Sequence, residues 1–70
     1  MAKANKSNLA KRIESLRRKR GLSQEKLARL ADVSNKTIIN IEAGINDNPT
    51  IETLRKIAKA FNVSVEELVK

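Results

Sequence analysis

The chain has 70 residues, a formal net charge of +7, and neither cysteine nor histidine. This length allows one domain whose core is too small to house a buried catalytic cleft, and the missing thiols and imidazoles exclude disulfides and nearly all zinc sites. No apolar run approaches the roughly 18 residues of a membrane span, and no apolar segment follows the basic N-terminus as in a signal peptide. We therefore expect a cytoplasmic protein with no cofactor, no metal and no membrane partner.

The positive charge is concentrated at the N-terminal end. Residues 1–20 carry eight basic side chains against the single acidic residue Glu14, whereas residues 21–70 contain equal numbers of both signs. A polyanion is the natural partner of such an asymmetry. A solvated basic helix that keeps a small protein soluble would show the same composition, so charge alone leaves both interpretations open.

The N-terminal part of the chain is expected to contain an arm and a first helix. Residues 1–7 show no hydrophobic periodicity, which predicts a flexible basic arm in front of a folded domain over residues 8–70. Leu9, Ile13 and Leu16 recur at helical spacing and predict a first helix that ends at the next glycine. Four consecutive cations close this helix, more than the interaction with the helix dipole requires.

Two short helices joined by a tight turn are predicted in the middle of the chain. Ser23 can cap a helix over 24–31 and Ser34 a second helix over 35–43, because a hydroxyl at the N-cap accepts hydrogen bonds from first-turn N–H groups. Gly44 can end the second helix with a positive φ. This is the layout of a helix-turn-helix, whose second helix enters the DNA major groove.

The second of these helices has a side that the core does not require. The helical period turns Ile38 and Ile41 inward, and Leu30 of the preceding helix is expected to be partly covered. An isoleucine on the opposite side either packs on a neighbouring helix or partner subunit, or contacts thymine methyl groups of DNA. Four side chains fall on that outer side: Asn35, Lys36, Ile39 and Asn40.

Two more helices complete the predicted fold. Thr50 can cap a helix whose apolar stripe begins at Ile51, and Asn62 can close it in the left-handed conformation. Ser64 and Glu67 form a capping box for a short last helix. The expected fold class is all-α, a compact bundle of five helices with a central helix-turn-helix.

With these elements in place, the chain resembles the Cro and phage-repressor type of helix-turn-helix protein, also called the XRE family. The similarity covers about residues 9–69, and the motifs follow one another in the order and at the spacing of the family. The resemblance implies a five-helix bundle of the lambda-repressor-like type. The motifs are R-x-x-x-G-L-S-Q at 17–24, V-S-x-x-T-I at 33–38, I-E-x-G at 41–44 and A-x-x-F-x-V-S-V-E-E-L at 58–68.

The resemblance also implies which side chains read bases. Asn35, Lys36 and Asn40 match positions that contact base edges in the family, and Ile39 lies on the same helix. The residue types suit this task, because asparagine pairs in bidentate fashion with adenine and lysine donates to guanine O6 and N7.

Five further side chains are assigned to the DNA backbone. Gln24 matches a family position that reaches a phosphate and braces the first side chain of the recognition helix. Lys11 and Arg18 belong to the basic first helix, and Thr37 is placed for a phosphate or a local hydrogen bond. Asn46 lies in a loop that lacks the basic residue often found there in the family, so the first helix is expected to supply more of the electrostatic attraction.

Arg17 and Glu42 match a pair that forms a partly buried salt bridge in relatives. The resemblance implies that this pair joins the first helix to the recognition helix. We assign it a structural role, because a bidentate arginine–carboxylate pair fixes geometry while contributing little net stability.

These features predict a sequence-specific, double-stranded DNA-binding transcriptional regulator that is not an enzyme, with repression as the preferred activity. Its partner is expected to be a pseudo-palindromic operator, bound by a homodimer whose contact lies at Val63, Val65 and Val69. The alternative is the antitoxin of a toxin–antitoxin pair, which would bind its own operator but mainly neutralise a partner protein. RNA or single-strand binding is disfavoured, because the only aromatic residue, Phe61, falls at a core position.

Overall fold

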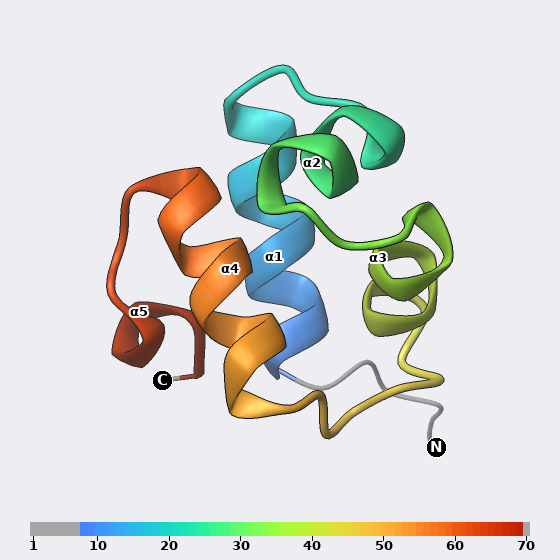
Figure 1. Cartoon of the computed structure of the whole chain (residues 1–70), viewed down its shortest axis with the longest axis vertical. Helices are drawn as coiled ribbons and strands as arrows, with labels where there is room; N and C mark the ends of the chain where they lie inside the picture. The colour runs from blue at the N-terminus through green and yellow to red at the C-terminus, as the bar shows by residue number, and fades with distance from the viewer. Residues whose placement is uncertain (1–7, 70) are drawn as a thin grey trace.

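The structure, a computed structural model, describes residues 8–69 of the chain (Figure 1). The predicted all-α class is confirmed, and the arm expected at residues 1–7 lies outside the described residues. Within the described part there are five helices and no strand. The helices are α1 (Asn8–Lys19), α2 (Gln24–Ala31), α3 (Asn35–Glu42), α4 (Ile51–Phe61) and α5 (Val65–Val69).

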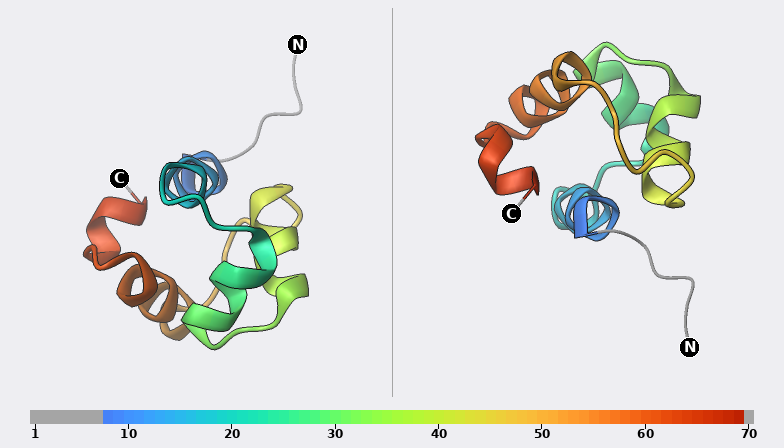
Figure 2. Two further views of the ribbon diagram at one scale, coloured as in Figure 1. Left: turned by 90° about the horizontal axis from the view of Figure 1, so that it is seen from above. Right: turned by 90° about the horizontal axis from the view of Figure 1, so that it is seen from below.

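The five helices surround one hydrophobic core. Figure 2 shows them arranged around a common centre, with α2 between α3 and α4 and with α1 next to both α3 and α5. Each helix contributes a large side chain with less than 2% of its surface exposed, so no helix can bury its apolar side without the others. These side chains include Ile13, Leu27, Ile38, Ile57, Phe61 and Leu68.

The predicted N-caps are present at the starts of α2, α3 and α4. The hydroxyl oxygen of Ser23 accepts from the Lys26 N–H at 3.0 Å, and that of Ser34 accepts from the Thr37 N–H at 3.1 Å. Thr50 caps α4 in the same way. These bonds satisfy first-turn N–H groups that have no partner inside the helix.

The helix ends explain how the chain turns so sharply. Gly44 and Asn62 adopt positive φ angles of 81° and 61°, as predicted. Asp32 closes α2 with a φ of 59°, which the sequence did not indicate, although a short polar side chain tolerates this conformation. α3 ends at Glu42, one residue earlier than expected, with Ala43 as its C-cap.

Two apolar residues are more exposed than predicted. Leu30 was expected to be partly covered and has 54% of its surface exposed, because Leu27, Ala28 and Ala31 occupy the core side of α2. Ile51, expected in the apolar stripe of α4, is 57% exposed, because it stands one turn before the first buried residue of that helix.

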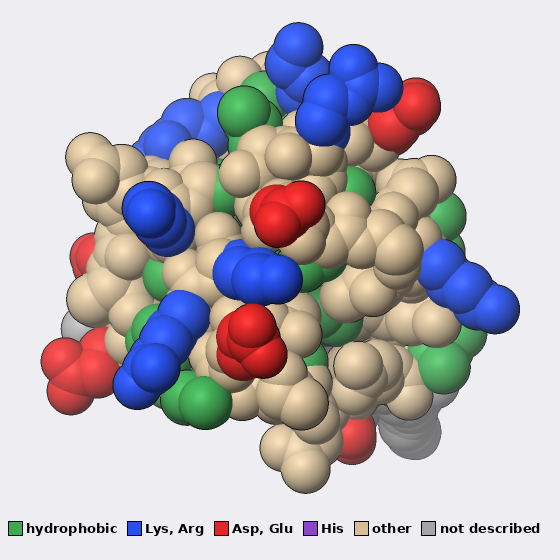
Figure 3. All heavy atoms as spheres, viewed as in Figure 1, with side chains coloured by type: hydrophobic (Ala, Val, Ile, Leu, Met, Phe, Trp, Pro, Cys, Tyr) green, Lys and Arg blue, Asp and Glu red, His purple; other side chains and the backbone are tan. Residues whose placement is uncertain are grey.

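The charges are distributed unevenly over the helices. α1 carries five basic residues and one acidic residue, which keeps the predicted excess of positive charge on this helix. By contrast, basic and acidic side chains are intermingled on the side of the molecule drawn in Figure 3, where α2 and α4 lie. The electrostatic asymmetry of the described residues is therefore a property of α1.

Gly21, between α1 and α2, offers a test of the backbone conformation alone. Its φ is 67°, and a Cβ added there would meet no atom within 4 Å. A side chain in the left-handed region costs about 1–2 kcal/mol, and asparagine tolerates it better than alanine. We expect Gly21→Ala to lower the free energy of unfolding by about 1 kcal/mol in urea denaturation, and Gly21→Asn to lower it less. Wild-type stability of Gly21→Ala would contradict the assigned conformation.

Candidate nucleic-acid interface

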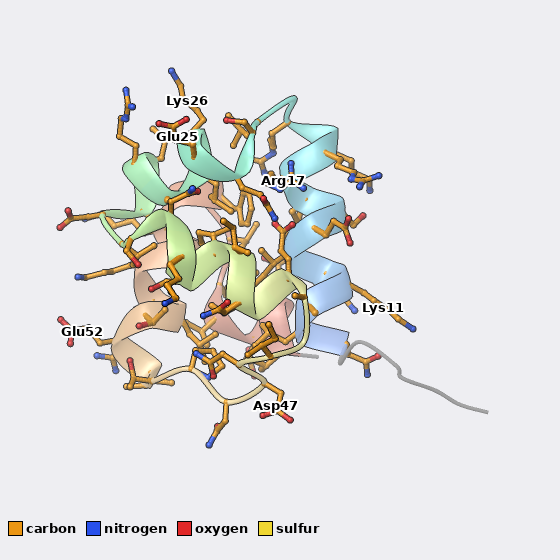
Figure 4. All side chains as sticks on the ribbon, turned by 90° about the vertical axis from the view of Figure 1, so that its right-hand side faces the viewer. Lys11, Arg17, Glu25, Lys26, Asp47 and Glu52 are labelled. Atoms are coloured by element: carbon orange, nitrogen blue, oxygen red, sulfur yellow. The ribbon has the colours of Figure 1, made fainter. Side chains whose placement is uncertain are left out.

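The outer side of α3 presents the residues assigned to base reading. Asn35 and Lys36 are exposed, Ile39 has 39% of its surface exposed, and Asn40 is half-buried. The same eight-residue helix buries Ile38 against the core. The structure thus brings the four predicted residues together on one side of α3, which faces the viewer in Figure 4.

A buried carboxylate connects this helix to α1 and α2. Glu42 Oε2 accepts from Nε of Arg17 at 2.7 Å, and Oε1 accepts from Nη2 of the same guanidinium at 3.0 Å. The Gln24 amide Nε2 also donates to Oε1 at 3.0 Å. Because Gln24 begins α2 and Glu42 ends α3, one carboxylate holds three helices in register. We call these three side chains the Glu42 cluster.

Arg17 is fully engaged in this cluster. Its side chain is 12% exposed and that of Glu42 is 4% exposed, and the remaining Nη1 donates to the Leu22 carbonyl at 2.8 Å. The hydrogen bonds that Arg17 donates to Glu42 raise the pKa of Arg17, burial opposes this shift, and the charges of Glu42 and Glu14 add to it. Because the pKa of Arg17 is raised in the folded state, its contribution to the stability of the fold is fully present at every pH below the ordinary pKa of arginine. The Arg17 guanidinium therefore stays charged at all ordinary pH values.

Gln24 has a local partner that the sequence did not predict. Its amide donates to Glu42, at the opposite end of α3 from the first side chain of the recognition helix, which Gln24 was expected to brace. A primary amide has two N–H donors and a carbonyl oxygen, so one donor and the acceptor remain for other partners. Gln24 is half-buried at the start of α2.

Thr37 and Arg18 each have a partner within their own helix or its cap. The Thr37 hydroxyl lies 2.8 Å from Ser34 Oγ, a contact that strengthens the N-cap of α3. Arg18 forms an ion pair with Glu14 at 2.8 Å, while its own side chain remains 71% exposed. Arg18 and Ile39 also line one shallow hollow between α1 and α3. The structure thus places Arg18 beside the outer side of α3.

The loop after α3 is organised on Asn40. The backbone N–H groups of Ile45 and Asn46 both donate to the Asn40 carbonyl, at 2.9 and 3.0 Å. Asn46 Oδ1 accepts from the Asn48 N–H at 3.1 Å, which closes an Asx-type turn. A turn at this position is typical of an asparagine in a loop, whereas the two bonds to the Asn40 carbonyl have no local sequence signal. Asn46 is consequently held close to the end of α3.

The remaining predicted residues lie away from α3. Lys11 is exposed on α1 and, as Figure 4 shows, projects from its outer edge. Val63 and Val65 are half-buried against the core, and Val69 on α5 is 50% exposed. The structure therefore leaves Val69 as the most exposed of the three valines assigned to the dimer contact.

Other kinds of site are not evident in residues 8–69. No cluster of acidic side chains in this part of the chain is arranged to hold a metal ion. None of its helices has the length and apolar character needed to cross a bilayer. A compact helical bundle whose second and third helices form a capped turn, with the outer side of α3 left uncovered, is a DNA-binding domain of the helix-turn-helix class.

The comparison with known proteins gives the family. Residues 13–68 match the helix-turn-helix family model. The chain is 40% identical over 57 residues to an uncharacterized HTH-type transcriptional regulator of Archaeoglobus fulgidus, and this match covers 81% of this chain and 80% of that protein. It is 38% identical over 58 residues to the cryptic phage CTXphi transcriptional repressor RstR of Vibrio cholerae, covering 83% of this chain and 51% of that protein.

The structural comparison agrees. The fold matches the structure of SinR, the master regulator for biofilm formation, in complex with DNA, with a TM-score of 0.85 and 32% identity. The match covers 89% of this chain and 98% of that one. This chain belongs to the XRE family of helix-turn-helix DNA-binding transcriptional regulators, as its motifs predicted, and the comparisons favour the regulator over the antitoxin alternative.

The Glu42 cluster generates a prediction about stability. Glu42→Ala would strand the buried Arg17 charge, and breaking a buried pair in this way costs about 3–5 kcal/mol. We expect a large loss of stability in thermal denaturation, and a loss of DNA binding only as a consequence of unfolding.

The matched control is Glu25→Ala, which breaks the exposed pair with Arg29, where both side chains are 73% exposed. An exposed pair of this kind contributes about 0–1 kcal/mol. A Glu42→Ala protein that melts like the wild type but has lost DNA binding would show that Glu42 acts directly on DNA.

Proposed function

We propose that the chain is a repressor that binds a pseudo-palindromic DNA operator as a homodimer and reads it with α3. The observation that supports this proposal is the outer side of α3, where Asn35, Lys36, Ile39 and Asn40 stand together on a rigid helix. Their chemistry covers the major-groove pattern: amides for adenine, an ammonium group for guanine, and methyl groups for thymine. We infer that each α3 reads about four to six base pairs of a half-site.

The positions around α3 support contacts with the DNA backbone. Gln24 stands at the start of α2, where the helix dipole favours a phosphate, and it keeps one N–H donor free of the Glu42 cluster. Arg18 is mostly exposed beside Ile39, and Asn46 is anchored next to the end of α3. We assign Thr37 and Lys11 to the same role. Such contacts orient the protein on the duplex, and base contacts then decide the sequence.

Repression requires only occupation of the operator. RstR is named a transcriptional repressor, and a bound bundle can exclude other proteins from a promoter without catalysis or a cofactor. We place this activity in the compartment that holds the DNA, the cytoplasm of a prokaryote.

A second copy would increase both affinity and selectivity. Two domains on half-sites one helical turn apart, about 34 Å, follow the usual geometry of this class. We assign the contact between copies to the end of α5 and the turn before it, with Val69 as its most exposed apolar side chain.

Selection from a random duplex library tests the proposed reading. We expect the protein to enrich a short pseudo-palindrome. Asn40→Ala should relax discrimination at one position by about 1–3 kcal/mol, because the side-chain amide is lost while the backbone carbonyl that anchors the loop remains. Arg18→Ala should weaken binding to all sequences alike.

Two results would count against this assignment. Retention of duplexes without a consensus would indicate binding by charge alone. An unchanged base preference in Asn40→Ala would show that this side chain does not read the operator.

The dimer contact is tested by Val69→Asp, which places a charge in the proposed interface. We expect sedimentation of the protein on its operator to show a weaker dimer. The control is Leu30→Asp, since Leu30 is similarly exposed, at 54% against 50%, and lies on a different helix, α2 (Figure 1). Loss of dimer in the Leu30 variant alone would move the contact to α2.

A further inference from the structure

α1 has two sides with different surroundings. Ala10 is buried and Arg17 pairs with Glu42 of α3, so this side of α1 faces α3. Figure 4 shows Arg17 pointing towards α3. An α-helix turns about 100° per residue, so a residue two positions further along projects to roughly the opposite side. Arg12 and Lys19 follow Ala10 and Arg17 at that interval. They therefore point away from α3.

These two cations define a surface that we call the outer flank of α1. Both are exposed, and Lys11, which we assigned to the operator backbone, stands at its edge. The distance along the axis from Arg12 to Lys19 is about 10 Å at 1.5 Å per residue. A shallow groove on this flank is lined by Asn8, Lys11, Arg12, Ser15, Leu16 and Lys19.

The outer flank contains no acidic side chain. Within residues 8–69, the ion pairs of α1 join Arg17 to Glu42 and Arg18 to Glu14, and neither Arg12 nor Lys19 takes part in one. Glu14, the only acidic residue of α1, lines the hollow beside α3 instead. The positive charge of the flank therefore remains available to a ligand.

A single bound duplex does not account for this charge. When α3 occupies a major groove, the DNA lies against the outer side of α3 and the adjoining edge of α1, where Arg18 is placed. Around the helix axis, Arg12 and Lys19 project about 100–120° away from Arg18. A ligand that contacts them approaches α1 from a different direction than this duplex.

We propose that the outer flank of α1 is a second DNA-binding surface, which holds the phosphate backbone of another duplex while α3 occupies the operator. This inference rests on the proposed function, because it requires α3 to be on the first duplex. A duplex presents about six phosphate charges over 10 Å of its axis, enough for both cations of the flank. The protein would then bring two DNA segments together.

The chemistry of the flank favours a duplex over other polyanions. Single-stranded nucleic acids are held by stacking on aromatic side chains, and the groove has none. A membrane surface requires an apolar side to insert, and Leu16, the one large apolar residue of the groove, packs against the core. Charge without base-reading groups suits sequence-independent phosphate contacts.

The test is a two-duplex capture experiment. The operator obtained by library selection is immobilised on beads and saturated with protein, unbound protein is removed, and a fluorescent duplex of unrelated sequence is added. The test variant is Arg12→Gln with Lys19→Gln. The matched control is Arg55→Gln with Lys59→Gln, which removes one arginine and one lysine from exposed positions of α4.

We expect the wild type and both variants to bind the operator equally. The wild type and the α4 control should capture the second duplex, and the α1 variant should capture it about tenfold less well, because each lost phosphate contact forfeits the release of roughly 0.9 counterion.

Two results would overturn the second site while leaving the proposed function intact. One is that the α1 variant captures the second duplex as well as the wild type does, or that even the wild type does not capture it. The other is a loss of operator affinity in the α1 variant, which would place Arg12 and Lys19 on the first duplex. Failure of the wild type to select any operator would instead refute the proposed function. In that case, the α1 variant and the α4 control would be compared for affinity to a duplex of arbitrary sequence. Equal affinities would show that the outer flank does not bind DNA either.

Discussion

The geometry of this domain depends on the hydrogen bonds that the buried carboxylate of Glu42 accepts. Burying a charge is costly, and here three side-chain hydrogen bonds from Arg17 and Gln24 offset that cost. The net gain in stability is small, but the bidentate geometry permits only one arrangement of the partners. Because the cluster spans α1, α2 and α3, it fixes the outer side of α3 relative to the start of α2. A recognition helix needs this rigidity, since its side chains and the flanking backbone contacts must meet one duplex at the same time.

The small size of the domain explains what is left on its surface. Five short helices place a large side chain from each into a shared core, and α3 contributes to it with only one side. The other side of α3 therefore adds little to folding, and its residues are free to suit a ligand. Ile39 illustrates this division, because it stands next to the fully buried Ile38 and is itself 39% exposed.

The charge of α1 follows a similar division. One side of the helix is committed to the fold through Arg17, whose guanidinium is paired and largely buried. The remaining cations are exposed, and their direction around the helix axis decides what they meet. Phosphate contacts are insensitive to sequence and sensitive to salt, so they suit attraction and positioning, while α3 supplies the discrimination between sequences. A single basic helix can in this way serve two surfaces, one beside α3 and one opposite to it.

Local sequence determined much of this protein: the five helices, their N-caps at Ser23, Ser34 and Thr50, and the family to which the motifs belong. These features depend on neighbours within a few residues, which is why spacing reveals them. Tertiary structure decided the rest. The amide of Gln24 meets a carboxylate 18 positions away in the sequence. The exposure of Leu30 and Ile51 could not be predicted either, because periodicity identifies the apolar side of a helix but not the neighbour that covers it. The two sides of α1 likewise became distinguishable only once α3 was placed. A helical period gives the directions of side chains around the helix axis, and only packing shows which side chains face a neighbouring helix.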